Sequence, residues 1–204
     1  MGSPKDRGVI FSVFLLTGGF MLRVEHYEYS KNKKVIEQIY EDSFPANEKF
    51  KFSILKQCNK SDNVHLSSIL LNDEIIGMQF TVGLPNDITY LMYFAIKEQF
   101  RCQKLGSKAL QQLVVASNNI LLCIEKPCDK VTESRKSFYL KNGFYETGIF
   151  IEDTGVQYEM LTSMEGYKPT NEDLRNRYEC MTKNKWLRGK IMKSFDADCK
   201  VLQG

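Results

Sequence analysis

Apolar and polar residues alternate along the chain with two periods, which predict a series of strands and helices. Asn72-Asp73, between two of the strand patterns, is typical of a tight antiparallel hairpin turn. The strand patterns are Leu22–Tyr29, His65–Leu71, Glu74–Val82, Leu91–Ile96, Ile120–Glu125, Phe144–Glu152 and Gln157–Thr162. The helix patterns are Lys34–Phe44, Glu48–Cys58, a segment that starts near Lys104, and Val131–Lys141. The predicted order is β-α-α-β-β-β-α-β-α-β-β.

The segment Tyr90–Leu110 carries the strongest chemical signal, because an apolar strand runs through a short basic turn into an amphipathic helix. The first amide groups of a helix have no partner within the helix, and the helix dipole adds positive charge there. Arg101, Lys104 and Lys108 add further positive charge, and Gly106 has no Cβ to keep a phosphate from the backbone. We therefore interpret this segment as an anion-binding turn, with a solvated basic helix start as the alternative.

A second segment, Ser134–Phe144, reads as a helix that ends in glycine and is followed by a strand. Asn142-Gly143 supplies the left-handed stop. Phe138 and Tyr139 occupy the last turns of this helix, where packed core aromatics are an alternative interpretation.

Together these residues resemble the GNAT acetyltransferase superfamily. Arg101–Ser107 is similar to its R/Q-x-x-G-x-G/A signature, with Lys104 at the first glycine position and Gly106 at the second. About thirty residues later, Phe138-Tyr139 and Gly143-Phe144 resemble its FY-x-x-x-GF element. The resemblance covers about Met21–Ser163 and implies an α/β fold: a mixed, mostly antiparallel central sheet of six to seven strands with flanking helices. In that family two mid-sheet strands separate and open a space for the pantetheine arm.

The resemblance implies acetyl-coenzyme A as cosubstrate. The strand residues would bind pantetheine, and the turn would bind pyrophosphate. The expected cofactor-binding residues are Phe94, Ala95, Ile96, Arg101, Cys102, Gln103, Lys104, Leu105, Gly106, Ser107, Arg135 and Phe138.

The implied activity is N-acetyl transfer to a primary amine by direct attack, through a tetrahedral intermediate. Tyr139 matches the family tyrosine that protonates the leaving thiolate; a structural hydroxyl is the alternative. Glu125, at the end of a buried strand, is the first candidate base, and Glu48, in a turn resembling the family's substrate-side loop, is the second. Either carboxylate could instead lie on a solvated surface. A non-catalytic acyl-coenzyme A sensor or scaffold is the alternative function.

A chain of 204 residues can bury a full core, and its formal net charge of +3 argues against disorder. Length and composition therefore indicate one compact domain. We expect a leader or extension over residues 1–20, the acetyltransferase domain over residues 21–163, and a helical basic appendage over residues 164–204. Residues 8–20 are apolar but short for a membrane span, so we expect them to be dispensable for chemistry; an extra strand, a partner contact and a membrane or secretion signal are the alternatives. In the appendage we expect one helix, Asn171–Ser194, with Trp186 and Leu187 on a docking face.

The remaining chemistry is sparse. The six cysteines show no paired CxxC spacing and His26 and His65 are the only histidines, so we expect no metal site and reduced thiols in the cytoplasm. The expected partner is a small-molecule or peptide amine. We expect no nucleic-acid or membrane partner, and leave a homodimer open.

Overall fold

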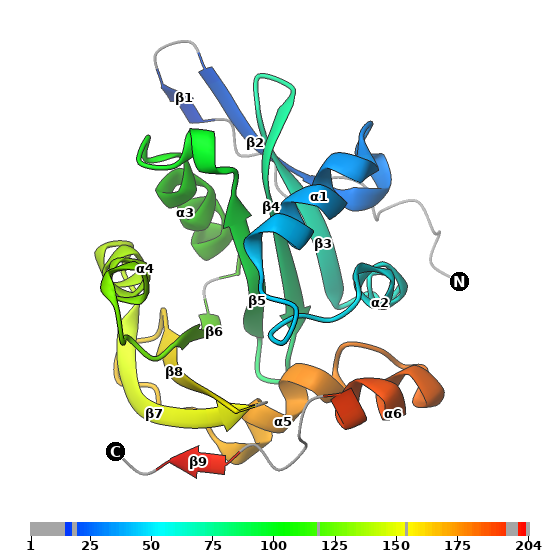
Figure 1. The fold of residues 1–204 in the computed structure, drawn as a ribbon, viewed down its shortest axis with the longest axis vertical. Helices are drawn as coiled ribbons and strands as arrows, with labels where there is room; N and C mark the ends of the chain where they lie inside the picture. Colours follow the sequence, from blue (N-terminus) through cyan, green and yellow to red (C-terminus); the bar gives the residue numbers. More distant parts are fainter. Residues whose placement is uncertain (1–14, 18–19, 118, 154, 195–199, 203–204) are drawn as a thin grey trace.

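A computed structural model describes residues 15–17, 20–117, 119–153, 155–194 and 200–202 (Figure 1). The strands are β1 (Leu15–Thr17), β2 (Phe20–His26), β3 (Val64–Leu71), β4 (Glu74–Gly83), β5 (Ile88–Ile96), β6 (Asn119–Glu125), β7 (Tyr145–Asp153), β8 (Val156–Thr162) and β9 (Lys200–Leu202). The helices are α1 (Lys33–Ser43), α2 (Phe52–Cys58), α3 (Leu105–Ser117), α4 (Lys130–Lys141), α5 (Asn171–Glu179) and α6 (Lys185–Ser194), with short 3-10 turns η1 (Tyr27–Tyr29) and η2 (Glu98–Phe100). From β2 to β8 the order is the predicted one.

The described strands form one sheet in the order β1-β2-β3-β4-β5-β6-β8-β7-β9. The seven strands β2 to β8 have at least seven residues each, and three-residue strands lie at the two edges. Within this sheet only β5 and β6 pair in parallel. The predicted mixed, mostly antiparallel α/β fold is confirmed.

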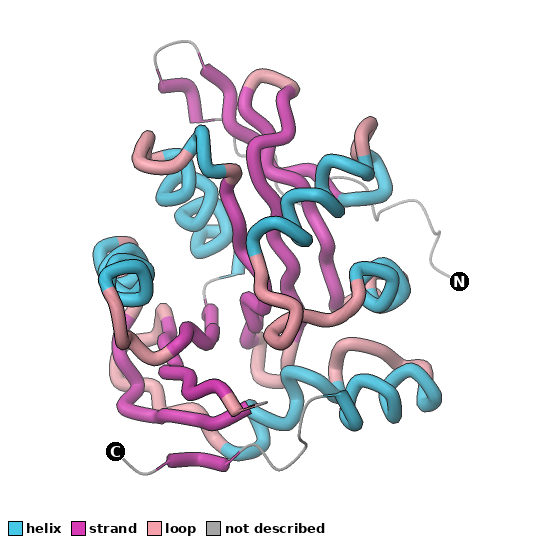
Figure 2. Tube along the Cα trace, in the orientation of Figure 1, coloured by secondary structure: helices cyan, strands magenta, loops and turns pink. Residues whose placement is uncertain are grey.

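Helices cover both faces of the sheet (Figures 1 and 2). Side chains of α1, α2, α5 and α6 share one core cluster with Tyr90 and Tyr93 of β5. Side chains of α3 and α4 pack into the clusters of the opposite face. We call these the α1 face and the α3 face.

Most of the expected first segment lies outside the described residues. Leu15–Thr17 is described as β1, which pairs antiparallel with β2. These three residues therefore extend the sheet by one short edge strand.

The helix expected from Glu48 begins only at Phe52, so that prediction is wrong by one turn. Two tyrosines hold the preceding backbone outside the helix. The Tyr40 hydroxyl donates to the Phe50 carbonyl at 3.0 Å, and the Phe50 N–H donates to the Tyr93 hydroxyl at 3.3 Å. Because the N–H and the carbonyl of Phe50 are both hydrogen-bonded to side chains, the loop from Phe44 to Lys51 is fixed over the sheet.

The single helix expected over Asn171–Ser194 is also wrong, since α5 ends at Glu179 and α6 begins at Lys185. Asn184 starts the second helix, because its side-chain oxygen accepts from the N–H groups of Trp186 and Leu187 at 3.0 and 3.1 Å.

The helices of the C-terminal segment belong to the main core. Leu174, Tyr178, Met181, Leu187 and Ile191 are buried in the cluster on the α1 face, whereas Trp186 is 65% exposed with Lys190 over its ring. Leu187 therefore docks on the domain itself and Trp186 faces outward. The domain boundary near residue 164 stays a prediction.

Among the described residues, no helix has the length and apolar character needed to cross a membrane. The same part of the chain contains no group of three or more His, Cys, Asp or Glu side chains placed to hold a metal ion.

Candidate active site

The two central strands separate partway along their length. β5 and β6 pair only from Ile88–Leu91 to Asn119–Leu122. Beyond this point β5 continues to Ile96 against β4, and β6 continues to Glu125 against β8. We call the region between Met92–Ile96 and Cys123–Glu125 the β5–β6 split. It matches the separation of strands that the resemblance implied.

Alternation along β5 decides which backbone groups face the split. The Lys97 N–H donates to the Ile76 carbonyl on β4 at 2.8 Å, so Ala95, two residues earlier, also directs its backbone groups toward β4. Phe94 and Ile96 therefore direct theirs toward the split. The Ile96 carbonyl accepts from Arg101 Nε at 3.0 Å, which leaves the backbone of Phe94 as the best-placed donor and acceptor.

The predicted anion-binding turn, residues 97–104, connects β5 to α3. Cys102 and Lys104 both have φ of 60°, the left-handed region that glycine favours and other residues rarely adopt. This conformation explains why the family signature has glycine at the position of Lys104. The side chains of Arg101, Cys102, Gln103 and Lys104 are exposed.

The start of α3 has the geometry of a helix N-terminus open to a ligand. The Lys108 N–H donates to the Lys104 carbonyl at 3.1 Å, so the amides of Leu105, Gly106 and Ser107 have no partner in a preceding helical turn. A Cβ on Gly106 would lie 3.5 Å from Ile96 and 3.6 Å from Phe138, ordinary contact distances. Gly106 thus lies where β5, α3 and α4 meet.

Aromatic rings connect the split to α4. Phe138 stacks on Phe94 with ring centroids 6.3 Å apart, and Tyr139 packs edge-on against Phe138 and Phe144. Burial raises the pKa of Tyr139 to about 12, and the nearby positive charge of Arg135 acts in the opposite direction. No hydrogen bond of the Tyr139 hydroxyl is found within the described part of the chain. Tyr139 is therefore a protonated phenol at neutral pH.

Both candidate carboxylates lie close to Tyr158, which the sequence interpretation missed. Glu125 on β6 is the direct sheet partner of Tyr158 on β8, so both side chains lie on the α1 face. Tyr158 Oη donates to Glu48 Oε2 at 3.0 Å. Glu125 Oε2 also lies 3.4 Å from Arg135 Nη1, which joins an expected cofactor residue to an expected catalytic one.

A buried polar cluster next to these residues was also missed. Asp153 Oδ2 accepts from Arg177 Nη2 at 2.7 Å and from Tyr178 Oη at 2.6 Å, and Arg177 Nη1 lies 3.7 Å from Cys123 Sγ. In the sequence, Arg177 is one of several basic residues of the C-terminal segment. Only its burial in the folded chain distinguishes it from them.

The family model of the GNAT acetyltransferases matches residues 33–144, which is more than half of the chain. The chain belongs to the GNAT family. No curated protein sequence is similar enough to this one to count as a match.

Solved structures share the GNAT fold at low sequence identity. A protein from Bacteroides thetaiotaomicron assigned to the GNAT family is 19% identical, with a TM-score of 0.61 over 84% of this chain and 96% of its own. The ribosomal-protein-S18-alanine N-acetyltransferase of Escherichia coli is 16% identical, with a TM-score of 0.53 over 74% of this chain and 99% of its own. Arabidopsis thaliana Naa50, in complex with the bisubstrate analogue CoA-Ac-MVNAL, is 16% identical, with a TM-score of 0.53 over 70% and 98%.

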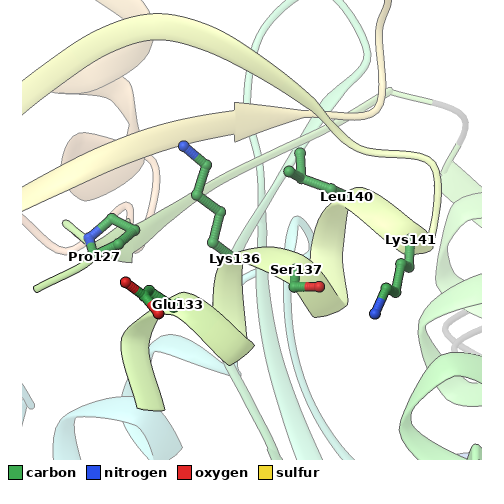
Figure 3. A pocket seen from close by; sticks show the side chains of 6 residues that line it. All are labelled: Pro127, Glu133, Lys136, Ser137, Leu140 and Lys141. Atoms are coloured by element: carbon green, nitrogen blue, oxygen red, sulfur yellow. The ribbon is translucent and has the colours of Figure 1, made fainter. Parts of the chain in front are cut away.

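A surface hollow of this GNAT domain lies away from the split. It has a volume of about 570 Å³ and runs along one side of α4 (Figure 3). Its lining residues are Pro127, Glu133, Lys136, Ser137, Leu140 and Lys141. None of these residues belongs to the predicted anion-binding turn or to the edges of the split.

Proposed function

We propose that this protein transfers the acetyl group of acetyl-coenzyme A to a primary amine. The observation that carries this proposal is the β5–β6 split. The predicted anion-binding turn lies at the end of β5, and the carboxylates of Glu48 and Glu125 lie on the α1 face of the sheet. The GNAT membership supports acetyl transfer in general.

The residues present fit acetyl-coenzyme A. Its pyrophosphate would bind the amides of Leu105, Gly106 and Ser107, where the helix dipole favours negative charge. Its pantetheine arm would pair with the backbone of Phe94 along the open edge of β5. The relatives support this class of donor, since Naa50 is described with an analogue that joins coenzyme A to a peptide.

Acetyl-coenzyme A supplies an activated acetyl group when bound. The protein supplies the groups that accept and donate protons and the N–H that stabilises the carbonyl oxygen. The neutral amine nitrogen attacks the carbonyl carbon, and the one proton that the nitrogen then carries in excess passes to a carboxylate, Glu48 or Glu125. The Phe94 N–H donates to the carbonyl oxygen, which becomes negative in the transition state. The carbon–sulfur bond then breaks, and Tyr139 Oη gives its proton to the sulfur. Solvent returns a proton to Tyr139.

A non-catalytic acyl-coenzyme A sensor is the second candidate. The observation that favours it is that each candidate carboxylate already has a partner, Arg135 for Glu125 and Tyr158 for Glu48. A sensor would bind acetyl-coenzyme A without using either residue for proton transfer.

One experiment separates the two functions. Purified protein is incubated with acetyl-coenzyme A and a panel of amines and peptides; thiol release and acetylated products are measured, together with the melting temperature. Transfer predicts thiol release that depends on the amine. A raised melting temperature with only background thiol release favours the sensor. If the melting temperature does not rise and no thiol is released above background, both functions are contradicted.

We also propose a cytoplasmic location. It is supported by the free thiol state of the five described cysteines, since reduced cysteines are typical of that compartment.

A further inference from the structure

The loop between α1 and α2 is tied to both sides of the β5–β6 split. On the β5 side, the Tyr93 hydroxyl lies 3.5 Å from the Glu48 carbonyl and accepts from the Phe50 N–H at 3.3 Å. On the other side, Tyr158 of β8 donates to the Glu48 carboxylate at 3.0 Å. The backbone of Glu48 is therefore held from β5 and its side chain from β8, so this residue lies across the split.

The position of Tyr158 in the sheet places this contact at the open end of the split. Tyr158 pairs with Glu125, the last residue of β6, three positions beyond the last pair that joins β5 and β6. An amine that approaches from the α1 face would meet the Glu48 carboxylate there. The edge of β5 at Phe94, which would bind acetyl-coenzyme A, and the side chain of Tyr139 lie toward the α3 face.

The two candidate bases have chemically different partners. Glu125 Oε2 lies 3.4 Å from the guanidinium of Arg135, a permanent cation that already contacts this carboxylate. Glu48 accepts from a neutral phenol, which orients Oε2 and leaves Oε1 for an ammonium group or a water. Burial, followed by the charge of Glu48, raises the pKa of Tyr158 above its usual value, so the phenol stays a donor while an amine loses its proton.

We propose that Tyr158 is a positioning residue that holds Glu48 as the proton acceptor for the amine. This inference rests on the proposed acetyl transfer. As the carbon–nitrogen bond forms, one proton leaves the amine nitrogen for Glu48 Oε1, directly or through one water, and later passes to solvent. The Tyr158 proton stays on its own oxygen throughout.

The test compares kcat/KM for the amine against pH in the wild type, Tyr158→Phe, Glu48→Gln and the double variant. Glu48→Gln should lower kcat/KM by about 10²-fold to 10⁴-fold and abolish the acidic limb of the profile. Tyr158→Phe should lower it by roughly tenfold to a hundredfold, as expected for loss of a hydrogen bond to a charged group, and move the acidic limb. KM for acetyl-coenzyme A should not change.

The double variant decides whether Tyr158 acts through Glu48. We expect it to be no slower than Glu48→Gln alone, because the tyrosine then has no carboxylate to position. Tyr145→Phe is the matched control, because the Tyr145 side chain of β7 is exposed. It should keep the wild-type profile. Melting temperatures of all variants exclude unfolding as the cause.

Three outcomes would overturn the proposal: a wild-type rate in Tyr158→Phe, multiplicative losses in the double variant, or an acidic limb that disappears in Glu125→Gln but persists in Glu48→Gln. These leave acetyl transfer itself intact. If the wild type releases no thiol with any amine, the proposed function fails, and this assignment fails with it.

Discussion

Arg177 of α5 and Asp153 of β7 form an ion pair at 2.7 Å in which each side chain is only 3% exposed. A buried pair is costly to break, because the remaining charge has no compensation. Arg177→Met should therefore lower the free energy of unfolding by about 3–5 kcal/mol in urea titrations.

Lys183→Met is the control for this pair. Lys183 and Asp62 lie 3.7 Å apart with side chains 82% and 72% exposed, so its loss should change stability by less than about 1 kcal/mol. Equal effects of the two substitutions would show that α5 does not stabilise the domain through Arg177.

Gly77→Ala should destabilise the protein. A Cβ at Gly77 would lie 2.4 Å from the Ala95 carbonyl oxygen and 2.7 Å from the Ile96 side chain, and strand backbones cannot move apart without breaking the sheet. We expect a loss of about 1–3 kcal/mol in the urea midpoint analysis. Gly189→Ala, in α6 with no atom within 4 Å of the new Cβ, should instead gain about 0.5–1 kcal/mol.

Lys104→Gly should stabilise the protein although it shortens a side chain. Lys104 has φ of 60°, which costs a residue with a Cβ roughly 1–2 kcal/mol but costs glycine little. After the greater chain entropy of glycine is subtracted, we expect a gain of up to about 1 kcal/mol. Gln111→Gly, within α3, should lose about 1 kcal/mol. A loss in Lys104→Gly as large as that control would contradict the left-handed turn.

The two histidines predict a pH dependence of stability. Their ring centroids lie 6.2 Å apart, and burial lowers the pKa of both, with the charge of His26 lowering that of His65 further. Because the unfolded chain binds protons more readily than the folded one, stability is fully present above the unfolded pKa of about 6.5 and falls as the pH drops below it. Urea midpoints from pH 8 to pH 5 measure this slope. It should flatten in His26→Gln/His65→Gln, and an unchanged slope there would assign it to other groups.

Tyr139→Phe should lower turnover by about 10²-fold to 10⁴-fold if the phenol is the general acid. Acetyl-coenzyme A affinity should change little, because the ring stays in its aromatic surroundings. Since the pKa of Tyr139 is about 12, the acid form persists in alkaline solution, and the wild-type rate should not decline up to pH 10. An alkaline decline near pH 8, or full turnover in Tyr139→Phe, would remove Tyr139 from this role.

The sequence predicted what depends on local patterns. Most strand and helix periods, the Asn72-Asp73 hairpin and the stop at Gly143 are encoded by neighbouring residues and are present in the structure. The strand expected to reach Tyr29 ends at His26 and is followed by the 3-10 turn η1. Long-range contacts decided the rest. Phe50 stays outside α2 because tyrosines from α1 and β5 bind its backbone, and no local pattern contains that information.

The same distinction applies to the site. The anion-binding turn and Tyr139 belong to short motifs, so residue type and spacing were enough to select them. Tyr158 and Arg177 carry no motif. Their importance comes from partners 110 and 24 residues away in sequence, Glu48 and Asp153, and it appears only once the sheet brings them together.

The four-residue ladder between β5 and β6 also has a consequence for solubility. Where the ladder ends, each strand keeps an unpaired edge, and such edges are templates for adding a strand from another chain. A ligand with amide groups that lies along β5 would occupy that template. Cosubstrate occupancy and resistance to aggregation should therefore rise together in this protein.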